Sequence, residues 1–140
     1  MLREPREICA AGDGSRITVE MTLRGKKLKL LIDCGATGNY ISPRTVSRIN
    51  IPFKSITPYS LEVVDGTKIN YQEGVIDQGT IPSKLVTPDG HTSFVQFDIA
   101  LIGKHEAILG MPWIKEHNPE IDWNAGTVQF SRCNYKGLQL

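Results

Sequence analysis

The run Leu30-Leu31-Ile32-Asp33-Cys34-Gly35-Ala36-Thr37 constrains this chain more than any other stretch. Its three apolar residues in a row predict a buried strand, and the strand delivers one acidic residue onto a tight turn, since glycine permits backbone conformations that other residues resist. A carboxylate at the end of a buried strand is costly unless another group uses it or pairs with it. We therefore expect Asp33 to be a functional residue.

Only one turn of this kind occurs in the sequence. The other Asp-Gly steps, at Asp13, Asp65 and Asp89, lack the apolar lead-in and are typical of ordinary turns. Acid–base chemistry by a pair of carboxyl groups needs two acidic residues held together. The simplest way to obtain them is for two copies of the chain to contribute one Asp33 each, which predicts a homodimer.

Length and charge narrow the class of protein. A chain of 140 residues suits one domain with a modest core, and it is too short for two lobes that each carry such a turn. The net charge is +1, and the densest basic group (residues 24–29) lies around a predicted turn and strand, so we expect a solvated face and no nucleic-acid partner. No signal peptide and no apolar run of membrane-spanning length is visible, so we expect no membrane partner.

The three cysteines, Cys9, Cys34 and Cys133, fit no metal-binding spacing. We expect free thiols in a reducing compartment, the cytoplasm, and neither a metal nor another cofactor.

Short extended runs separated by turn residues predict a mainly β, barrel-like domain. Two short helices are expected, one after Ser42-Pro43 that Asn50 ends and one that Asn118-Pro119 ends. The expected helices cover 43–49 and 111–117. The expected extended runs cover 17–23, 27–32, 39–42, 60–64, 68–71, one or two runs within 81–97, 108–110, 121–123 and 127–130.

Two segments carry a family resemblance. Residues 31–42, LIDCGATGNYIS, resemble the active-site signature of retroviral-type aspartic proteases, above all the branch found in polyproteins of Ty3/gypsy long-terminal-repeat retrotransposons. Residues 107–113, AILGMPW, and 118–123, NPEIDW, are similar to the closing segment of the same branch. The two motifs lie in the order and at the separation that the family shows, and the resemblance covers roughly residues 15–133.

The resemblance implies a retropepsin-like acid-protease barrel with one lobe per chain. It divides the chain into a flexible lead-in or polyprotein linker at residues 1–14, a protease domain at 15–133 and a C-terminal tail at 134–140. The implied activity is that of an aspartic endopeptidase, a homodimer that cleaves an extended peptide or polyprotein with an Asp-activated water. The implied location is the cytoplasm, including virus-like particles.

The resemblance also assigns roles to residues. Asp33 is the catalytic residue, and the hairpin around Asp65-Gly66 takes the place of the family's flap, where the pattern alone would indicate a plain surface hairpin. The active-site loop comprises Cys34, Gly35, Ala36 and Thr37; the candidate flap and substrate-binding residues are Val63, Val64, Asp65, Gly66, Ile69 and Tyr71; and the element that packs under the catalytic loop comprises Ile108, Leu109 and Gly110.

Cys34 departs from the family pattern, which has Thr or Ser after the catalytic Asp. In the family, that hydroxyl donates a hydrogen bond across the dimer to the partner's loop, and a thiol is a weaker donor. A second interpretation therefore stays open, a retropepsin-like module that dimerises or binds peptides and has weak or no activity. A third places the same fold within a ubiquitin-linked shuttle protein.

Other residues offer weaker alternatives. Cys34 with His91, His105 or His117 as base would make a thiol nucleophile, and His105, His117 and Cys133 would make a zinc site without a known spacing. We expect His117 to be a cation at a helix end. Asp98 and Asp122 are candidate second carboxylates within one chain, but we expect Asp98 to be solvated and Asp122 to be structural.

Overall fold

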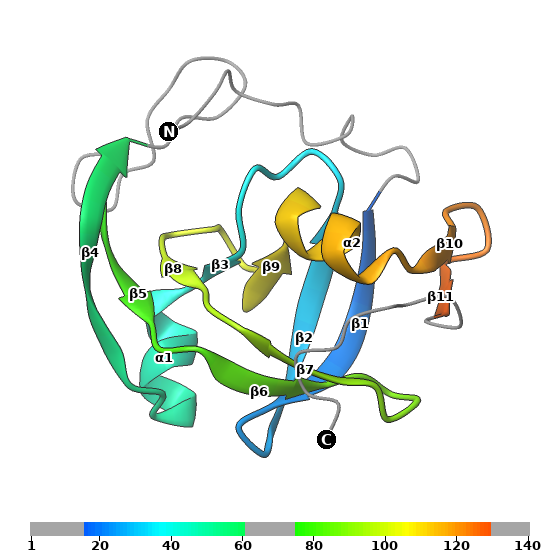
Figure 1. Ribbon diagram of the computed structural model, residues 1–140, viewed down its shortest axis with the longest axis horizontal. Coiled ribbons are helices and arrows are strands. Elements are labelled where there is room, and N and C mark those ends of the chain that lie inside the picture. Colours follow the sequence, from blue (N-terminus) through cyan, green and yellow to red (C-terminus); the bar gives the residue numbers. More distant parts are fainter. Residues whose placement is uncertain (1–15, 61–74, 130–140) are drawn as a thin grey trace.

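The computed structural model describes residues 16–60 and 75–129, and most of its strands lie in one curled sheet (Figure 1). Nine strands follow the order β4-β5-β8-β3-β9-β2-β1-β6-β7, and β10-β11 form a separate pair. This architecture confirms the mainly β fold with two short helices. The elements are β1 Arg16–Leu23, β2 Lys26–Asp33, β3 Tyr40–Ile41, α1 Pro43–Ile49, β4 Phe53–Ser60, β5 Val75–Thr80, β6 Ser83–Val86, β7 Thr92–Val95, β8 Asp98–Ile99, β9 Ala107–Leu109, α2 Met111–His117, β10 Glu120–Asp122 and β11 Thr127–Gln129.

The first hairpin delivers the candidate catalytic residue. β1 and β2 pair antiparallel from Arg16↔Asp33 to Leu23↔Lys26, and Arg24 (φ 53°) and Gly25 (φ 85°) form the two-residue turn. Two consecutive positive φ values are typical of the tight turn whose twist matches that of the paired strands. The strands predicted at 17–23 and 27–32 are confirmed, and β2 ends at Asp33.

β9 occupies the middle of the sheet, between β2 and β3. It runs parallel to β2, with Ile32 opposite Leu109, and antiparallel to β3, with Tyr40 opposite Ile108. β2 therefore has a neighbour on both edges, and its last four residues are all buried. This position explains why the sequence changes from alternating to continuously apolar as it approaches Asp33.

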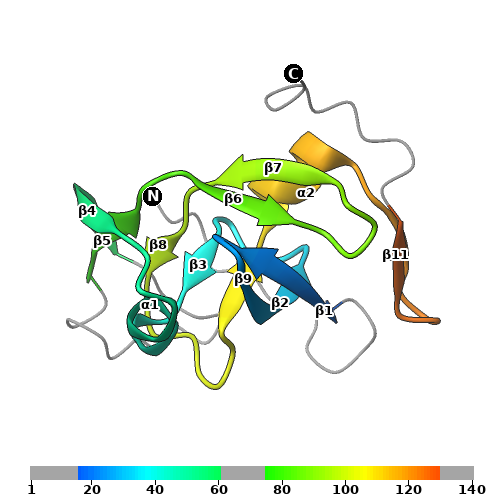
Figure 2. The ribbon, with the colours of Figure 1, turned by 90° about the horizontal axis from the view of Figure 1, so that it is seen from below.

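The main apolar core lies between the sheet and both helices. Val46 and Ile49 of α1 and Trp113 of α2 are buried in it, although the two helices lie well apart (Figure 1, Figure 2). Trp123 packs against the same core, so both tryptophans are packing residues. The buried members are Met21, Leu23, Leu28, Leu30, Ile32, Ile41, Val46, Ile49, Ile51, Leu85, Val95, Phe97, Ile99, Ala107, Leu109 and Trp113.

Both helices begin and end where the sequence predicts. The Ser42 side chain caps α1 by accepting from the Thr45 N–H at 3.0 Å, with Pro43 in the first turn. Asn50 (φ 55°) and Asn118 (φ 44°) end the two helices in the left-handed conformation, which asparagine tolerates better than most residues.

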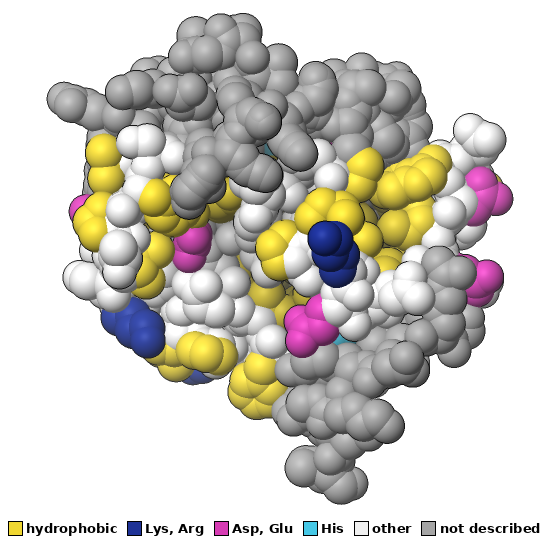
Figure 3. Space-filling model, turned by 45° about the horizontal axis from the view of Figure 1, so that its top comes forward, with side chains coloured by type: hydrophobic (Ala, Val, Ile, Leu, Met, Phe, Trp, Pro, Cys, Tyr) yellow, Lys and Arg dark blue, Asp and Glu magenta, His cyan; other side chains and the backbone are white. Residues whose placement is uncertain are grey.

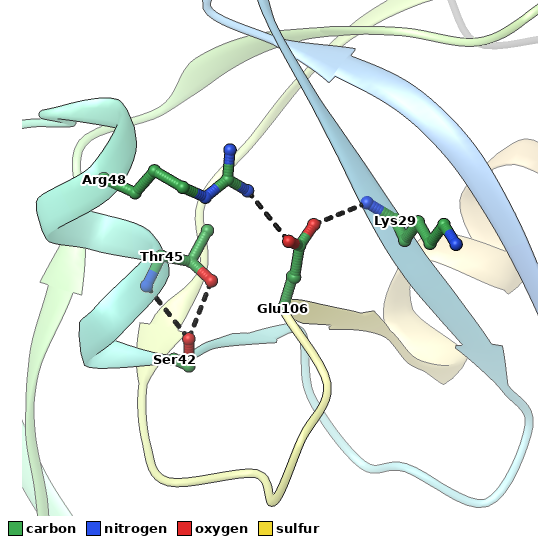
Figure 4. A network of polar contacts seen from close by, with 5 residues as sticks. All are labelled: Lys29, Ser42, Thr45, Arg48 and Glu106. Atoms are coloured by element: carbon green, nitrogen blue, oxygen red, sulfur yellow. Dashed lines mark hydrogen bonds and ion pairs between the residues drawn. The ribbon is translucent and has the colours of Figure 1, made fainter.

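Glu106 joins α1 to the central strands (Figure 4). One carboxylate oxygen accepts the Lys29 backbone N–H at 2.8 Å, and the other lies 3.0 Å from Arg48 Nη2. The Glu106 backbone carbonyl accepts the N–H of Ser42 at 3.1 Å, beside the Ser42–Thr45 cap of α1. Glu106 directly precedes β9, and its side chain adds one more hydrogen bond between this segment and β2.

Strands β4, β5 and β8 were not predicted. β4 lies at one end of the sheet order, its residues are largely exposed without alternation, and it contains Pro58, all of which weaken the strand signal. The register of the pair shifts between Ser55 and Tyr59, around this proline. The expected strand at 60–64 is described only at Ser60, the last residue of β4, and the one at 68–71 lies outside the described residues.

Some large apolar side chains reach the surface, namely Phe53, Phe94 and Leu101. On the face shown in Figure 3, apolar side chains gather in patches and few charged groups stand among them. Within residues 16–60 and 75–129, no helix has the length and apolar character that a membrane crossing requires.

Candidate active site

Asp33 lies at the end of β2 on the tight turn that the sequence predicts. Its side chain is fully buried in the single chain. The Gly35 N–H donates to Asp33 Oδ1 at 3.0 Å, and the Ala36 N–H donates to the Asp33 carbonyl oxygen at 3.1 Å. The turn therefore gives the carboxylate a backbone donor, which offsets part of the cost of burying it.

The junction between β9 and α2 holds the active-site loop from the other side. The Gly110 N–H donates to Asn39 Oδ1 at 2.9 Å, and the Met111 N–H donates to the Ala36 carbonyl oxygen at 3.0 Å. A Cβ atom on Gly110 would lie 2.7 Å from that same carbonyl oxygen and would collide with the carbonyl oxygen of Gly38. Only glycine permits this close approach of two backbone segments.

The structure brings together the loop and the apolar-apolar-Gly element that the sequence pairs with it. Ile108 and Leu109 lie opposite Leu31 and Ile32 in the β2–β9 ladder, and Gly110 follows them against the loop. Their contribution is to the position of the loop, since none of them carries a group that could transfer a proton.

Cys34 differs from the sequence-based expectation of free thiols, because in the structure it is disulfide-bonded. The other two cysteines, Cys9 and Cys133, lie outside the described residues. A sulfur in a disulfide is not the thiolate that nucleophilic catalysis requires, so the structure does not support the alternative of a cysteine nucleophile.

The predicted flap residues lie outside the described residues. They are Val63, Val64, Asp65, Gly66, Ile69 and Tyr71. The strands on either side of them are described, since Ser60 at the end of β4 pairs with Val75 at the start of β5. The flap role of residues 63–71 stays a prediction.

The expectation that His117 is a helix-end cation is wrong. His117 is fully buried, its ring stacks on Trp113 with centroids 4.7 Å apart, and its Nδ1 lies 3.1 Å from His91 Nε2. Burial, and then the proximity of His91, lowers the pKa of His117 to about 4, so the ring is neutral at pH 7. The described part of the chain contains no group of three or more His, Cys, Asp or Glu side chains suited to a metal ion.

The two other candidate carboxylates are structural. Asp122 accepts the N–H groups of Asn124 and Ala125 at 3.1 Å each, within the β10–β11 turn, as expected. Asp98 is not the solvated residue that the sequence suggests: it is half-buried and accepts the Tyr59 hydroxyl hydrogen bond at 2.5 Å.

Sequence reasoning missed the roles of Asn39 and Tyr40, which follow the active-site loop. Asn39 holds Gly110, and the Tyr40 hydroxyl lies 3.3 Å from Thr37 Oγ1. Both residues belong to the motif at residues 31–42. Their hydrogen-bond partners are determined by the fold, so no pattern in the neighbouring sequence indicates them.

Several solved structures share this fold. The retroviral protease-like domain of Ddi1 from Leishmania major is 18% identical, with a TM-score of 0.57 over 81% of this chain and 84% of that one. The EIAV protease in complex with the inhibitor HBY-793 is 18% identical, with a TM-score of 0.52 over 81% of this chain and 98% of that one. A retropepsin-like aspartic protease from Rickettsia conorii is 14% identical, with a TM-score of 0.53 over 76% of each chain.

These likenesses establish the retropepsin-like fold that the resemblance implies. The family described as "PEG10/RTL1 protease domain" matches residues 29–137, which include the active-site loop, the β9–α2 junction and the closing hairpin. This retropepsin-like chain belongs to the PEG10/RTL1 protease domain family.

Proposed function

We propose that this chain is an aspartic endopeptidase that acts as a homodimer, and that it processes a polyprotein of the Ty3/gypsy kind in the cytoplasm or within virus-like particles. The observation that carries the proposal is the setting of Asp33. Its carboxylate ends a buried strand, accepts a backbone N–H from its own turn, and sits on a loop that the β9–α2 junction clamps. Such rigid support is what a catalytic carboxylate needs and what an ordinary surface turn lacks.

In the proposed dimer, one Asp33 from each protomer would share a single proton. Two carboxylates held close together cannot both ionise, since like charges repel in a cleft of low dielectric constant. The ionised one takes a proton from water, while the protonated one polarises the scissile carbonyl group and later helps the amine to leave. The two roles are interchangeable between protomers, and the pair titrates as a unit.

Burial of Asp33 in the single chain adds a requirement. The side chain has no exposed surface, so the covering of the turn must rearrange when two protomers bring their carboxylates together. Because the proposed site needs two protomers, activity should rise more steeply than in proportion to protein concentration until the dimer is saturated.

A peptide-library cleavage assay at mildly acidic pH tests the proposal. Cleavage is expected from the wild-type chain and is expected to be blocked by an inhibitor that mimics the tetrahedral intermediate. Asp33→Asn should reduce the rate by roughly a thousandfold or more, because the amide cannot exchange the proton. Asp122→Asn, a matched change in the β10–β11 turn, should leave the rate unchanged. Persistent cleavage by Asp33→Asn would contradict the mechanism.

A second candidate function, a dimerisation or peptide-binding module without activity, is favoured by one observation. Cys34 lacks the hydroxyl that the resemblance assigns to the cross-dimer contact, and its sulfur is in a disulfide. The assay should therefore be run with and without a reductant, and with Cys34→Ser. We expect Cys34→Ser to strengthen association or turnover. A stable dimer that never cleaves under any of these conditions supports the module and excludes the enzyme.

A further inference from the structure

A series of neighbouring polar side chains runs from the active-site loop to β4. The Thr37 hydroxyl lies 3.3 Å from that of Tyr40, and Tyr59 packs against the apolar cluster to which Tyr40 belongs. Tyr59 donates to Asp98 Oδ2 at 2.5 Å, and Gln96 Nε2 donates to Asp98 Oδ1 at 3.0 Å. We refer to these five side chains as the hydroxyl chain.

The hydroxyl chain lies against a second apolar cluster, distinct from the main core. Ala36 connects this cluster to the active-site loop, while Tyr59 and Ile76 connect it to β4 and β5. Its buried members are Leu31, Ala36, Tyr40, Ile76, Ala100 and Ile108, with Ile56, Tyr59 and Ile102 packed against them. Hydroxyl groups in such surroundings need partners, and a hydrogen bond to a carboxylate is among the stronger kinds.

The Tyr59 hydroxyl is a permanent donor. Burial, followed by the hydrogen bond to Asp98, raises the pKa of Tyr59 far above its ordinary value of 10.0. The hydroxyl therefore keeps its proton at any pH at which the protein would work, and the contact with Asp98 is not interrupted by ionisation of the tyrosine.

Two glycines make room for the hydroxyl chain. A Cβ atom on Gly38, within the loop, would lie 2.8 Å from the Tyr40 hydroxyl oxygen. A Cβ atom on Gly79 of β5 would collide with Gln96 Nε2 and lie 3.1 Å from Asp98 Oδ1. The backbone on both sides is thus shaped to admit these polar side chains.

The backbone connection that the hydroxyl chain reinforces is narrow. β5 meets β8 through one Cα pair, Gly79↔Asp98, and through two hydrogen bonds between Thr80 and Phe97. Within the described residues, β4 pairs only with β5, so the β4–β5 pair is attached to the site-bearing strands mainly at that point. Side chains that connect β4 to the active-site loop therefore have a large influence on the position of the loop relative to the β4–β5 pair.

We propose that Tyr59 and Asp98 are positioning residues, which act through Tyr40 and Thr37 to hold the loop bearing Asp33 in a fixed place relative to the β4–β5 pair. This inference rests on the proposed peptidase function for its kinetic consequence. Its structural consequence, a looser loop when the hydroxyl chain is cut, is independent of that function.

Hydrogen exchange of the full chain, followed by NMR, tests the structural consequence. The Gly35 and Ala36 amides are the reporters, since both are hydrogen-bonded to Asp33. Tyr59→Phe keeps the ring and removes only the hydroxyl. We expect it to speed exchange at both amides by roughly tenfold beyond the change due to global stability.

Two further comparisons separate positioning from a general loss of stability. Thr87→Val removes a hydroxyl that donates to Asp89 at the same distance, 2.5 Å, in the β6–β7 turn, and it should leave the two amides unaffected after the same correction. Asp98→Asn keeps an acceptor oxygen and should protect the amides better than Asp98→Ala. The proposal is overturned if Tyr59→Phe matches Thr87→Val, or if the two Asp98 variants exchange alike.

The kinetic consequence is measured with the same variants in the peptide-cleavage assay. Tyr59→Phe should lower kcat/KM by roughly tenfold, and Asp98→Asn should restore part of the loss seen in Asp98→Ala. Normal kcat/KM in Tyr59→Phe contradicts positioning of the catalytic loop. If the wild-type chain cleaves nothing, the proposed function fails, and the exchange rates still decide the role of the hydroxyl chain.

Discussion

Gly110 is the residue at which the active-site loop tolerates no added atom. Gly110→Ala would press a methyl group onto two backbone carbonyl oxygens, which cannot rotate away as a side chain could. We expect a loss of about 3 kcal/mol in the free energy of unfolding, together with weaker activity. Gly103→Ala is the comparison, because an added Cβ there meets nothing within 4 Å. In this variant the free energy of unfolding should fall only by the backbone strain energy of an alanine at φ +68°, about 1–2 kcal/mol. Urea unfolding of both variants checks the difference, and equal losses would refute it.

His117 makes stability depend on pH in a defined direction. The histidine of the unfolded chain takes up a proton near its ordinary pKa of 6.5, whereas the folded one does so only near 4. Between these values the unfolded state binds more protons, so stability is fully present above about pH 6.5 and is lost as the pH falls toward 4. The loss is on the order of 3 kcal/mol at most.

Urea unfolding at pH 7.5 and at pH 4.5 measures this loss, with His117→Phe as the variant that lacks the titrating ring. His91 faces His117, and Glu116 Oε1 lies 3.8 Å from His117 Nε2, so both stay in place in that variant. The variant should show a flatter pH dependence than the wild type. Identical slopes would mean that His117 is not the group responsible.

At the scale of elements, Glu106 links α1, β2 and β9 by one carboxylate. Glu106→Ala removes the acceptor of the Lys29 N–H and should cost about 1–2 kcal/mol of unfolding free energy. Glu106→Gln keeps an acceptor oxygen and loses only the ion pair with the half-exposed Arg48, so it should cost roughly 0.5 kcal/mol or less. Arg48→Ala should match the glutamine variant. If Glu106→Gln is as costly as Glu106→Ala, the ion pair matters more than the backbone contact.

Elements with local signals were predictable, and elements defined by distant contacts were not. Ser42, Asn50 and Asn118 mark the helix boundaries because capping depends on neighbouring residues only. β4 was missed because an edge strand with exposed faces and Pro58 carries no alternating pattern. The burial of His117 was missed because it depends on His91, which stands 26 residues earlier in the sequence.

At the scale of the whole molecule, the proposal that two chains contribute one Asp33 each makes a quantitative prediction for mixed dimers. Wild-type chain and Asp33→Asn are mixed in equal amounts, at a total concentration high enough to saturate the dimer. Random pairing leaves about one quarter of the dimers with two acidic groups, so activity should fall to about one quarter of that of the same total of wild type. A chain that works alone would retain about one half, which would rule out the shared site.

The candidate site was predictable in its centre and not in its surroundings. The strand-turn pattern identified Asp33, and the family resemblance paired its loop with Gly110. The links from Thr37 through Tyr40 to Tyr59 and Asp98 join residues that the fold alone brings together. No periodicity in a sequence reports on such contacts, which is why Asp98 looked like a solvated residue.

The central placement of β9 has a consequence for the order of events during synthesis. A nascent chain that has just emerged with β1, β2 and β3 lacks the strand that must lie between the last two, because residues 107–109 are not yet made. Until the ribosome has passed Gly110 and Met111, nothing clamps the turn that carries the acid. The loop that bears Asp33 therefore reaches its clamped form only after these later residues have been made.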